Sequence, residues 1–122
     1  MTVTVEKVDF ISVLTQDVER SRAFYTELLG LPVSASGDFW FEVDTPNVTI
    51  NVTDAATIGF EFRPALAVAA LRVPDVAAAR KELEEKGVQF FGETMDHGVC
   101  HMAPFADPDG NALLLHRRYA PK

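Results

Sequence analysis

The chain has a single cysteine, Cys100, among its 122 residues, so it cannot form an internal disulfide. A lone cysteine is typical of proteins that fold in a reducing compartment. The sequence also lacks the run of about 18 apolar residues that a membrane-spanning helix needs, and its first residues lack the basic start and apolar stretch of a secretion signal. We therefore expect a cytoplasmic protein with no membrane partner.

Basic residues are scarce, because 11 Lys and Arg stand against 18 Asp and Glu, which gives a net charge of −7. Nucleic-acid binding needs clustered Lys and Arg, so we expect no nucleic-acid partner. An acidic surface favours cationic ligands, although an acidic balance also serves solubility alone. The sequence contains no Gly-rich phosphate loop and no nucleophile elbow of a hydrolase.

What the sequence does contain is a repeat. The segment Phe10–Val18 leads into a helix-like run, and the similar segment Val68–Val76 leads into another, with Asp17 and Asp75 58 residues apart. A repeat of this period predicts two copies of one supersecondary unit, with a cleft between them. The chain is long enough for one domain with a sizeable core.

Hydrophobic periodicity and turn residues predict the same order of elements in each half. Asp17 and Asp75 are candidate N-caps of two helices, which Gly30 and Gly87 end. The predicted helices span about 18–29 and 76–86. The predicted strands are 8–14, 31–35, 38–43, 48–53, 67–73, 88–91, 99–105 and 111–117.

This order predicts an α+β fold made of two βαβββ modules. Module one covers about residues 1–59 and module two about 64–122, within a single domain of residues 1–122. Neither module covers both faces of its sheet, so we expect a curved mixed sheet with the helices outside and a concave cleft inside. The concave side is where we expect the functional residues.

Three motifs carry a resemblance to a known family: Asp17–Tyr25 with Leu28–Leu31, then Val73–Val76, then Phe105–Asn111. Their sequence, order and spacing resemble the vicinal oxygen chelate superfamily. That superfamily includes glyoxalase I, extradiol dioxygenases, fosfomycin-resistance enzymes and bleomycin-binding proteins. The motifs span almost the whole chain, so the resemblance implies the glyoxalase-like fold throughout.

The resemblance also implies where a divalent metal would bind. Enzymes of the superfamily take ligands from early in the first strand of each module and from the last strand, four residues after the turn glycine. These positions hold Phe10, Asn51, Val68 and Leu114 in this chain. One amide and three hydrocarbon side chains are a poor donor set for a divalent metal. We therefore expect no metal, no cofactor and none of the metal-dependent chemistry of the family.

Two histidines are the next candidates. If Asp107–Gly110 is a four-residue turn, His101 lies opposite His116 on the concave face, beside Leu114. The pair could hydrogen-bond each other or water, contact a ligand, or form part of a displaced metal site. A change of one residue in the turn would send one histidine to the other face.

The aromatic side chains are mostly expected in the core, but Trp40 and Phe60 are the candidates for the wall of an apolar pocket. Arg72 is expected on the concave face with Val68, where it either anchors an anionic group of a ligand or pairs with a nearby acid. Both interpretations of Arg72 remain open at this point.

The sequence thus predicts a metal-free small-molecule-binding protein of the glyoxalase/bleomycin-resistance type, a homodimer that sequesters a toxic or antibiotic-like compound. The expected ligand is apolar or aromatic, with cationic compounds favoured by the charge. The alternative is an enzyme of the lyase or dioxygenase type that is metal-independent or uses a relocated metal at His101 and His116. No catalytic residue is identified. The predicted ligand-binding residues are His101, His116, Arg72, Phe10, Trp40, Asn51, Phe60, Val68 and Leu114.

Overall fold

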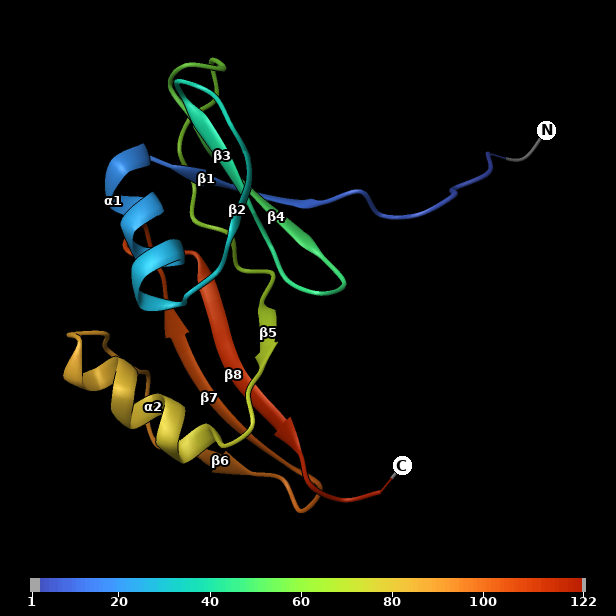
Figure 1. Cartoon of the computed structure of the whole chain (residues 1–122), viewed down its shortest axis with the longest axis vertical. Coiled ribbons are helices and arrows are strands. Elements are labelled where there is room, and N and C mark those ends of the chain that lie inside the picture. The colour runs from blue at the N-terminus through green and yellow to red at the C-terminus, as the bar shows by residue number, and fades with distance from the viewer. Residues whose placement is uncertain (1–2, 122) are drawn as a thin grey trace. The chain divides into compact units, whose positions relative to one another are not determined.

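The computed structural model describes residues 3–121; Met1, Thr2 and Lys122, at the ends of the predicted domain, lie outside the described residues. The chain divides into two compact units at Arg63 and Pro64, here called module one and module two. Each contains a four-stranded mixed sheet with its helical segment on one face (Figure 1). The α+β fold with two βαβββ modules is therefore confirmed.

Module one has the strand order β1-β4-β3-β2. Strand β1 runs parallel to β4, and the other neighbours are antiparallel. The strands are β1 (Ile11–Thr15), β2 (Val33–Ser36), β3 (Trp40–Asp44) and β4 (Thr49–Asp54). Helix α1 (Val18–Ala23) continues into the π-helical turn η1 (Phe24–Leu28).

The first helix begins where the sequence predicts. The Asp17 carboxylate accepts a hydrogen bond from the backbone N–H of Arg20 at 3.1 Å, which satisfies one free donor of the first turn. Gly30 follows the helical segment with a φ of 71°, a conformation that glycine adopts without steric cost. The predicted helix at about 18–29 is confirmed as α1 and η1 together.

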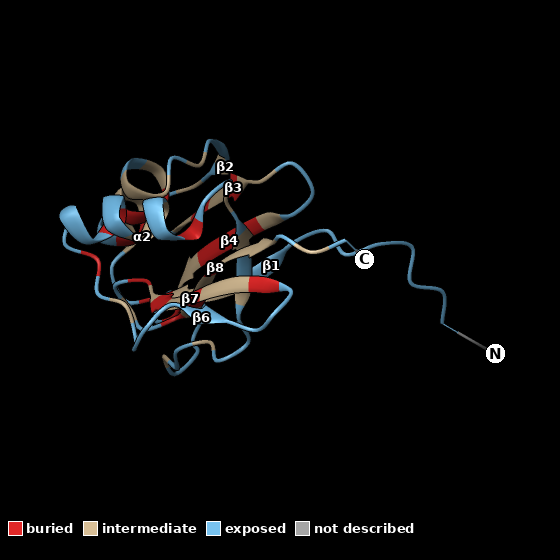
Figure 2. Ribbon diagram, turned by 90° about the horizontal axis from the view of Figure 1, so that it is seen from below, coloured by how far each residue is buried: buried red, intermediate tan, exposed pale blue. Residues whose placement is uncertain are grey.

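The core of module one lies between its sheet and its helical segment. Alternate strand residues Phe41, Val43, Ile50 and Val52 are at most 2% exposed. Strands β3 and β4, which carry them, show buried stretches in red in Figure 2. Phe24 and Tyr25 pack against each other edge to face, with ring centroids 5.3 Å apart, and the Tyr25 ring also contacts the Phe41 ring. Since side chains alternate along a strand, the intervening residues face away from the helix.

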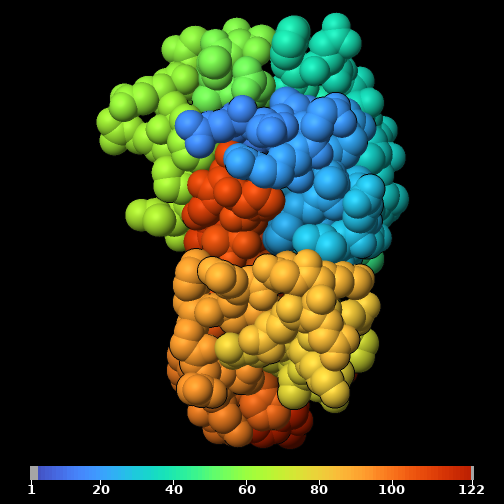
Figure 3. All heavy atoms as spheres, turned by 90° about the vertical axis from the view of Figure 1, so that its left-hand side faces the viewer, coloured from blue at the N-terminus to red at the C-terminus, as the bar shows by residue number. Residues whose placement is uncertain are grey.

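Module two repeats the arrangement with the order β5-β8-β7-β6. Its strands are β5 (Ala69–Arg72), β6 (Met95–Asp96), β7 (Cys100–Ala106) and β8 (Ala112–Arg118). Helix α2 (Val76–Glu85) begins at Asp75, which accepts from the backbone N–H of Ala78 at 3.0 Å. Figure 3 shows the outer surface of α2 in yellow. The buried side chains of this module are Val76, Leu83, Val88, Ala103, Phe105, Leu113 and Leu115, together with Cys100, Asp107 and Asn111.

The prediction of a strand at 88–91 is wrong. That segment makes only one isolated bridge, between Phe90 and Phe105, whose rings pack 5.0 Å apart. Gly92 then turns the chain with a φ of 74°, which ends the extended conformation. The fourth strand of the sheet is the two-residue β6, further along the chain.

The predicted pairing of His101 with His116 is also wrong. His101 lies opposite Arg117, and His116 lies opposite Met102. The Asp107–Gly110 turn is closed by a hydrogen bond from the Gly110 N–H to the Asp107 carbonyl, but strand pairing resumes only at the bond from Asp107 N–H to the Asn111 carbonyl. Gly110, with a φ of 88°, is therefore the extra residue of a bulge.

This one extra residue places the two histidines on opposite faces of the sheet, since side chains alternate. His101 shares the face of Ala103 and Phe105, whereas His116 shares the face of Met102. No helix within residues 3–121 is long and apolar enough to cross a membrane.

Candidate functional site

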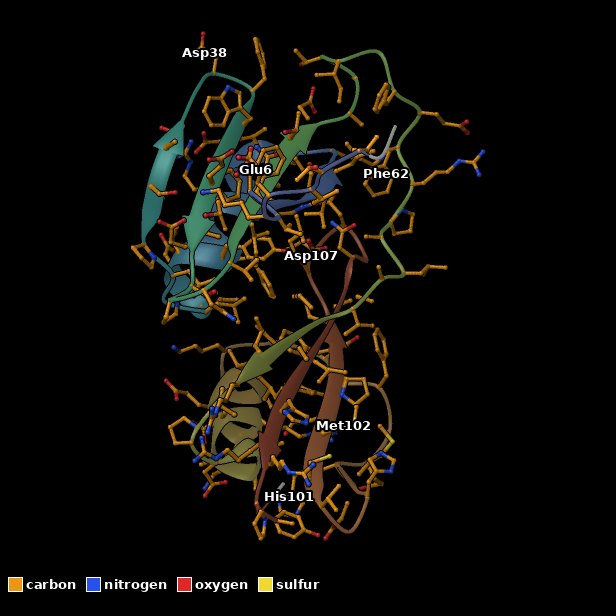
Figure 4. The ribbon with its side chains drawn as sticks, turned by 90° about the vertical axis from the view of Figure 1, so that its right-hand side faces the viewer. Glu6, Asp38, Phe62, His101, Met102 and Asp107 are labelled. Carbon is orange, nitrogen blue, oxygen red and sulfur yellow. The ribbon has the colours of Figure 1, made fainter. Side chains whose placement is uncertain are left out.

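The face of module one that points away from α1 carries most of its polar strand residues. We call it the acceptor face, defined by Ser12, Leu14, Trp40, Glu42, Asp44, Thr49, Asn51 and Thr53. Strand register places these side chains in rows, with Ser12 beside Asn51 and Asn51 beside Glu42. Figure 4 looks at the sheet of each module from the side opposite its helix.

Asn51 is the centre of a hydrogen-bonded network on this face, although it is only 9% exposed. The hydroxyls of Ser12 and Thr53 donate to Asn51 Oδ1 at 2.9 and 2.7 Å. Its Nδ2 donates to Glu42 Oε2 at 3.1 Å. Four side chains from three strands are thus fixed relative to one another, which is how proteins orient groups that bind polar ligands.

Trp40 lies at the edge of the same face, opposite Thr53 in the register. Its indole lies against Gly37, where an added Cβ would overlap the ring. Gly37 therefore leaves the space that the indole occupies. Trp40 is partly buried, so part of its ring remains available for an aromatic contact.

The other predicted residues of module one lie outside the strands. Phe10 directly precedes β1 and is 48% exposed. Phe60 is 62% exposed in the segment after β4, where its backbone N–H bonds to the Ala55 carbonyl. Of the predicted residues, Asn51 and Trp40 therefore share the acceptor face.

The register supports the predicted equivalence of Asn51 and Leu114. Asn51 lies beside Ser12, and Leu114 lies beside Ala70. Ser12 and Ala70 are themselves 58 residues apart, which is the spacing of the repeat. Val68, two residues before Ala70, precedes β5 and is 49% exposed.

The corresponding face of module two has a different chemical character. One row of the register runs through Arg72, His116, Met102 and Met95 on four adjacent strands. Leu114 lies on the same face. Arg72 and His116 are thus brought side by side as expected for a shared face, whereas His101 is not.

His101 instead belongs to a cluster with Asp96 and Tyr119, on the opposite face. Its Nε2 lies 3.4 Å from Asp96 Oδ2, and its ring lies 4.8 Å from the Tyr119 ring. The Tyr119 hydroxyl donates to Asp96 Oδ1 at 2.7 Å. Figure 4 labels His101 and its neighbour Met102 on β7.

Hydrogen bonding shifts two pKa values in this cluster. The pKa of the Asp96 carboxyl is lowered chiefly because the Tyr119 hydroxyl donates to it, with smaller contributions from the Gly98 N–H and from His101. The same bond raises the pKa of Tyr119, chiefly because the hydroxyl would lose the hydrogen bond with its proton, and further because a negative charge would then lie beside the carboxylate. The cluster ties β6, β7 and the end of β8 together.

No group of three or more His, Cys, Asp or Glu side chains within residues 3–121 is arranged to hold a metal ion. The acceptor face can instead form hydrogen bonds and aromatic contacts. Besides Trp40 and Asn51, sequence reasoning identified no member of this face, and so it missed Ser12, Leu14, Glu42, Asp44, Thr49 and Thr53. Glu42 had a detectable signal, because an acidic residue alternates with core residues Phe41 and Val43 in a predicted strand.

Comparison with family models gives a match over residues 7–115 to the model described as Glyoxalase/Bleomycin resistance protein/Dioxygenase superfamily. This match covers most of the chain. Comparison with curated proteins gives no match.

Solved structures with the same fold come from several bacteria. A glyoxalase/bleomycin resistance protein/dioxygenase from Nocardioides has a TM-score of 0.78 and 19% identity, over 99% of this chain and 92% of that one. TnmS3, an antibiotic binding protein from Streptomyces sp. CB03234, has a TM-score of 0.77 and 27% identity, over 96% and 99%. Lactoylglutathione lyase from Agrobacterium tumefaciens has a TM-score of 0.77 but 12% identity, over 93% and 94%, which indicates a shared fold alone.

Proposed function

Because the chain belongs to the glyoxalase/bleomycin resistance protein/dioxygenase superfamily, we propose that it is a metal-free small-molecule-binding protein that sequesters an antibiotic-like or otherwise toxic compound. The observation that carries this proposal is the Asn51 network on the acceptor face. It presents fixed polar groups beside an aromatic residue, which is the usual composition of a small-molecule site.

The metal-free part of the proposal rests on donor chemistry. The four positions at which the related metalloenzymes bind metal hold Phe10, Asn51, Val68 and Leu114. Three of these side chains offer no donor atom, and the amide oxygen of Asn51 already accepts two hydrogen bonds. This set does not fit a divalent metal, which needs imidazole, carboxylate or thiolate ligands.

The alternative function, an enzyme with a relocated metal, requires His101 and His116 to bind the same ion. His101 and His116 lie on opposite faces of the sheet of module two. One ion cannot be bound by both side chains across a sheet. We therefore favour binding over catalysis, and treat Arg72 and His116 as candidate ligand contacts of module two.

The likeness to TnmS3 suggests the class of ligand. TnmS3 is described as an antibiotic binding protein, and it covers 96% of this chain at 27% identity. We propose a ligand of similar kind, with an aromatic part that Trp40 and Phe60 contact. We further propose that the protein works as a cytoplasmic homodimer without nucleic-acid partners, in keeping with its net charge of −7.

Two measurements test metal-free ligand binding. Elemental analysis of protein purified without a metal-affinity tag is expected to find less than stoichiometric zinc, iron, nickel and manganese. Bleomycin and a panel of planar antibiotics are then tested by thermal shift. A ligand at 100 times its Kd adds about 2.7 kcal/mol of stability, which raises Tm by several degrees.

Stoichiometric metal whose removal abolishes ligand binding would contradict the metal-free proposal. Failure of every compound in the panel to shift Tm would contradict sequestration of this ligand class. Light scattering on the same preparation measures the oligomeric state, and a monomer at micromolar concentration would rule out the homodimer.

A further inference from the structure

We infer that the acceptor face binds the protonated amino group of its ligand, with Glu42 as the residue that determines this specificity. The inference rests on the proposed function and adds to it a chemical class of ligand: an aromatic amine. Its basis is the direction of the hydrogen bonds around Asn51.

The orientation of the Asn51 amide follows from Glu42. An ionised carboxylate only accepts hydrogen bonds, so the Asn51 atom that lies 3.1 Å from Glu42 Oε2 must be the nitrogen. The amide oxygen therefore faces Ser12 and Thr53. Since an amide oxygen has no proton, both hydroxyls must donate to it.

The hydroxyl groups of the acceptor face already donate their protons to other side chains of the protein. Ser12 and Thr53 donate to Asn51, and the Thr49 hydroxyl donates to Asp44 Oδ1 at 2.7 Å. What these hydroxyls still offer a ligand is oxygen lone pairs. Apart from the second N–H of Asn51, the side chains of the Asn51 network and of the Thr49–Asp44 pair present acceptors only.

Glu42 is the one carboxylate of the Asn51 network; the other carboxylate of the face, Asp44, accepts from the Thr49 hydroxyl. Among the described residues, Asn51 is the one side-chain hydrogen-bond partner of Glu42, through Oε2. Its other oxygen, Oε1, accepts from none of them, and no Lys or Arg among them forms an ion pair with it. Glu42 is also partly buried, which strengthens its attraction for a cation that reaches it.

A protonated amine has the complementary properties. It carries a positive charge and up to three donors, and it has no acceptor that would need a proton from the face. Hydrogen bonds between charged partners are about twice as strong as neutral ones. Trp40 lies two residues from Glu42 on the same face, so its ring and the Glu42 carboxylate can contact two parts of one ligand.

The test compares two probes that differ in one group: 1-naphthylmethylamine, which is protonated at pH 7, and the neutral 1-naphthylmethanol. Their affinities are measured by NMR titration of the ¹⁵N-labelled full-length chain, through shifts of amides in β1, β3 and β4. We expect the amine to bind about tenfold more tightly than the alcohol, and this ratio to fall in 0.5 M NaCl.

The variant Glu42→Gln keeps an oxygen for the Asn51 amide but removes the charge. We expect it to lower the affinity for the amine about tenfold and leave the alcohol unchanged. Glu85→Gln is the matched control, because it removes the same charge from the exposed surface of α2. We expect Glu85→Gln to show the same ratio of amine affinity to alcohol affinity as the wild-type protein.

Equal affinity of the wild-type protein for both probes would overturn the inference while leaving small-molecule binding intact. An unchanged preference for the amine in Glu42→Gln would also overturn it. Absence of any shift with either probe would overturn the inference and count against the proposed function as well. The comparison of probes on the wild-type chain stands even if the variant fails to fold.

Discussion

Replacing Asn111 with alanine is expected to destabilise module two strongly. Asn111 is 1% exposed and joins the last hairpin to the segment before β5. Its Nδ2 donates to the Asp107 carboxylate at 2.8 Å, and its Oδ1 accepts from the backbone N–H of Ala65 at 2.7 Å. The substitution removes both bonds from a buried site.

The magnitude follows from the two bonds. A hydrogen bond to a charged group contributes about 1.5–3 kcal/mol, and a neutral one about 0.5–1.5 kcal/mol. The expected loss in the free energy of unfolding is therefore about 3 kcal/mol. The backbone N–H of Asn111 still donates to Asp107 Oδ1 in the variant, so we expect the turn itself to survive.

Urea denaturation followed by circular dichroism measures the effect. With a slope of about 2 kcal/mol per molar urea, the midpoint is expected to fall by about 1.5 M. Asn47→Ala is the matched control, because Asn47 lies in an exposed turn and accepts one bond from Thr45 at 3.2 Å. A loss below 0.5 kcal/mol in Asn111→Ala, with an unchanged slope, would refute the reasoning.

Three further predictions concern other parts of the chain. Tyr119→Phe should raise the pKa of Asp96 toward its ordinary value of 3.8, because it removes the hydroxyl that donates to the carboxylate. In the wild-type protein the pKa of Asp96 is lower in the folded state than in the unfolded state. The stability that this carboxylate contributes is therefore present above the unfolded-state pKa and is lost as the pH falls through the folded-state pKa. A carboxyl ¹³C titration that does not change would contradict this. Gly37→Ala should displace the Trp40 indole and alter its fluorescence, whereas an unaltered emission spectrum would argue against the contact. Phe41→Ala should cost about 3–5 kcal/mol in urea denaturation, since Phe41 is 0% exposed, and a cost below 1 kcal/mol would be inconsistent with this core.

The elements that the sequence predicts well have strong local signals. Asp17 and Asp75 each precede a helix, and each side chain accepts from the backbone N–H three residues later. A capping residue acts within one turn, so its effect does not depend on distant parts of the chain. The two helices are therefore predicted to within a few residues.

The strand predicted at 88–91 shows the limit of such signals. Val88 and Phe90 are apolar and suit a strand, but Val88 is buried against the core and Phe90 packs on Phe105. An apolar run is compatible with either a strand or a buried connection. Long-range packing decides between them, and local sequence does not report it.

Strand register is the second feature that local sequence does not predict, and it determines which site residues lie on the same face of a sheet. The residues Asp107–Gly110 identify a turn, but the bulge at Gly110 adds one residue before pairing resumes at Asn111. A change of one residue exchanges the two faces of a strand. This is why Arg72 and His116 lie on a common face while His101 lies on the other.

The surroundings of Glu42 in module one also depend on strand register. Alternation along β3 tells only that Glu42 and Trp40 share a face. The partner of Glu42 is set by the turn between β3 and β4, where the Thr45 N–H bonds to the Val48 carbonyl at 2.9 Å. With that turn, Glu42 lies opposite Asn51; one residue more would place it opposite a core position. Because a carboxylate beside an amide fixes which amide atom faces it, the turn also sets the direction of every hydrogen bond in the Asn51 network.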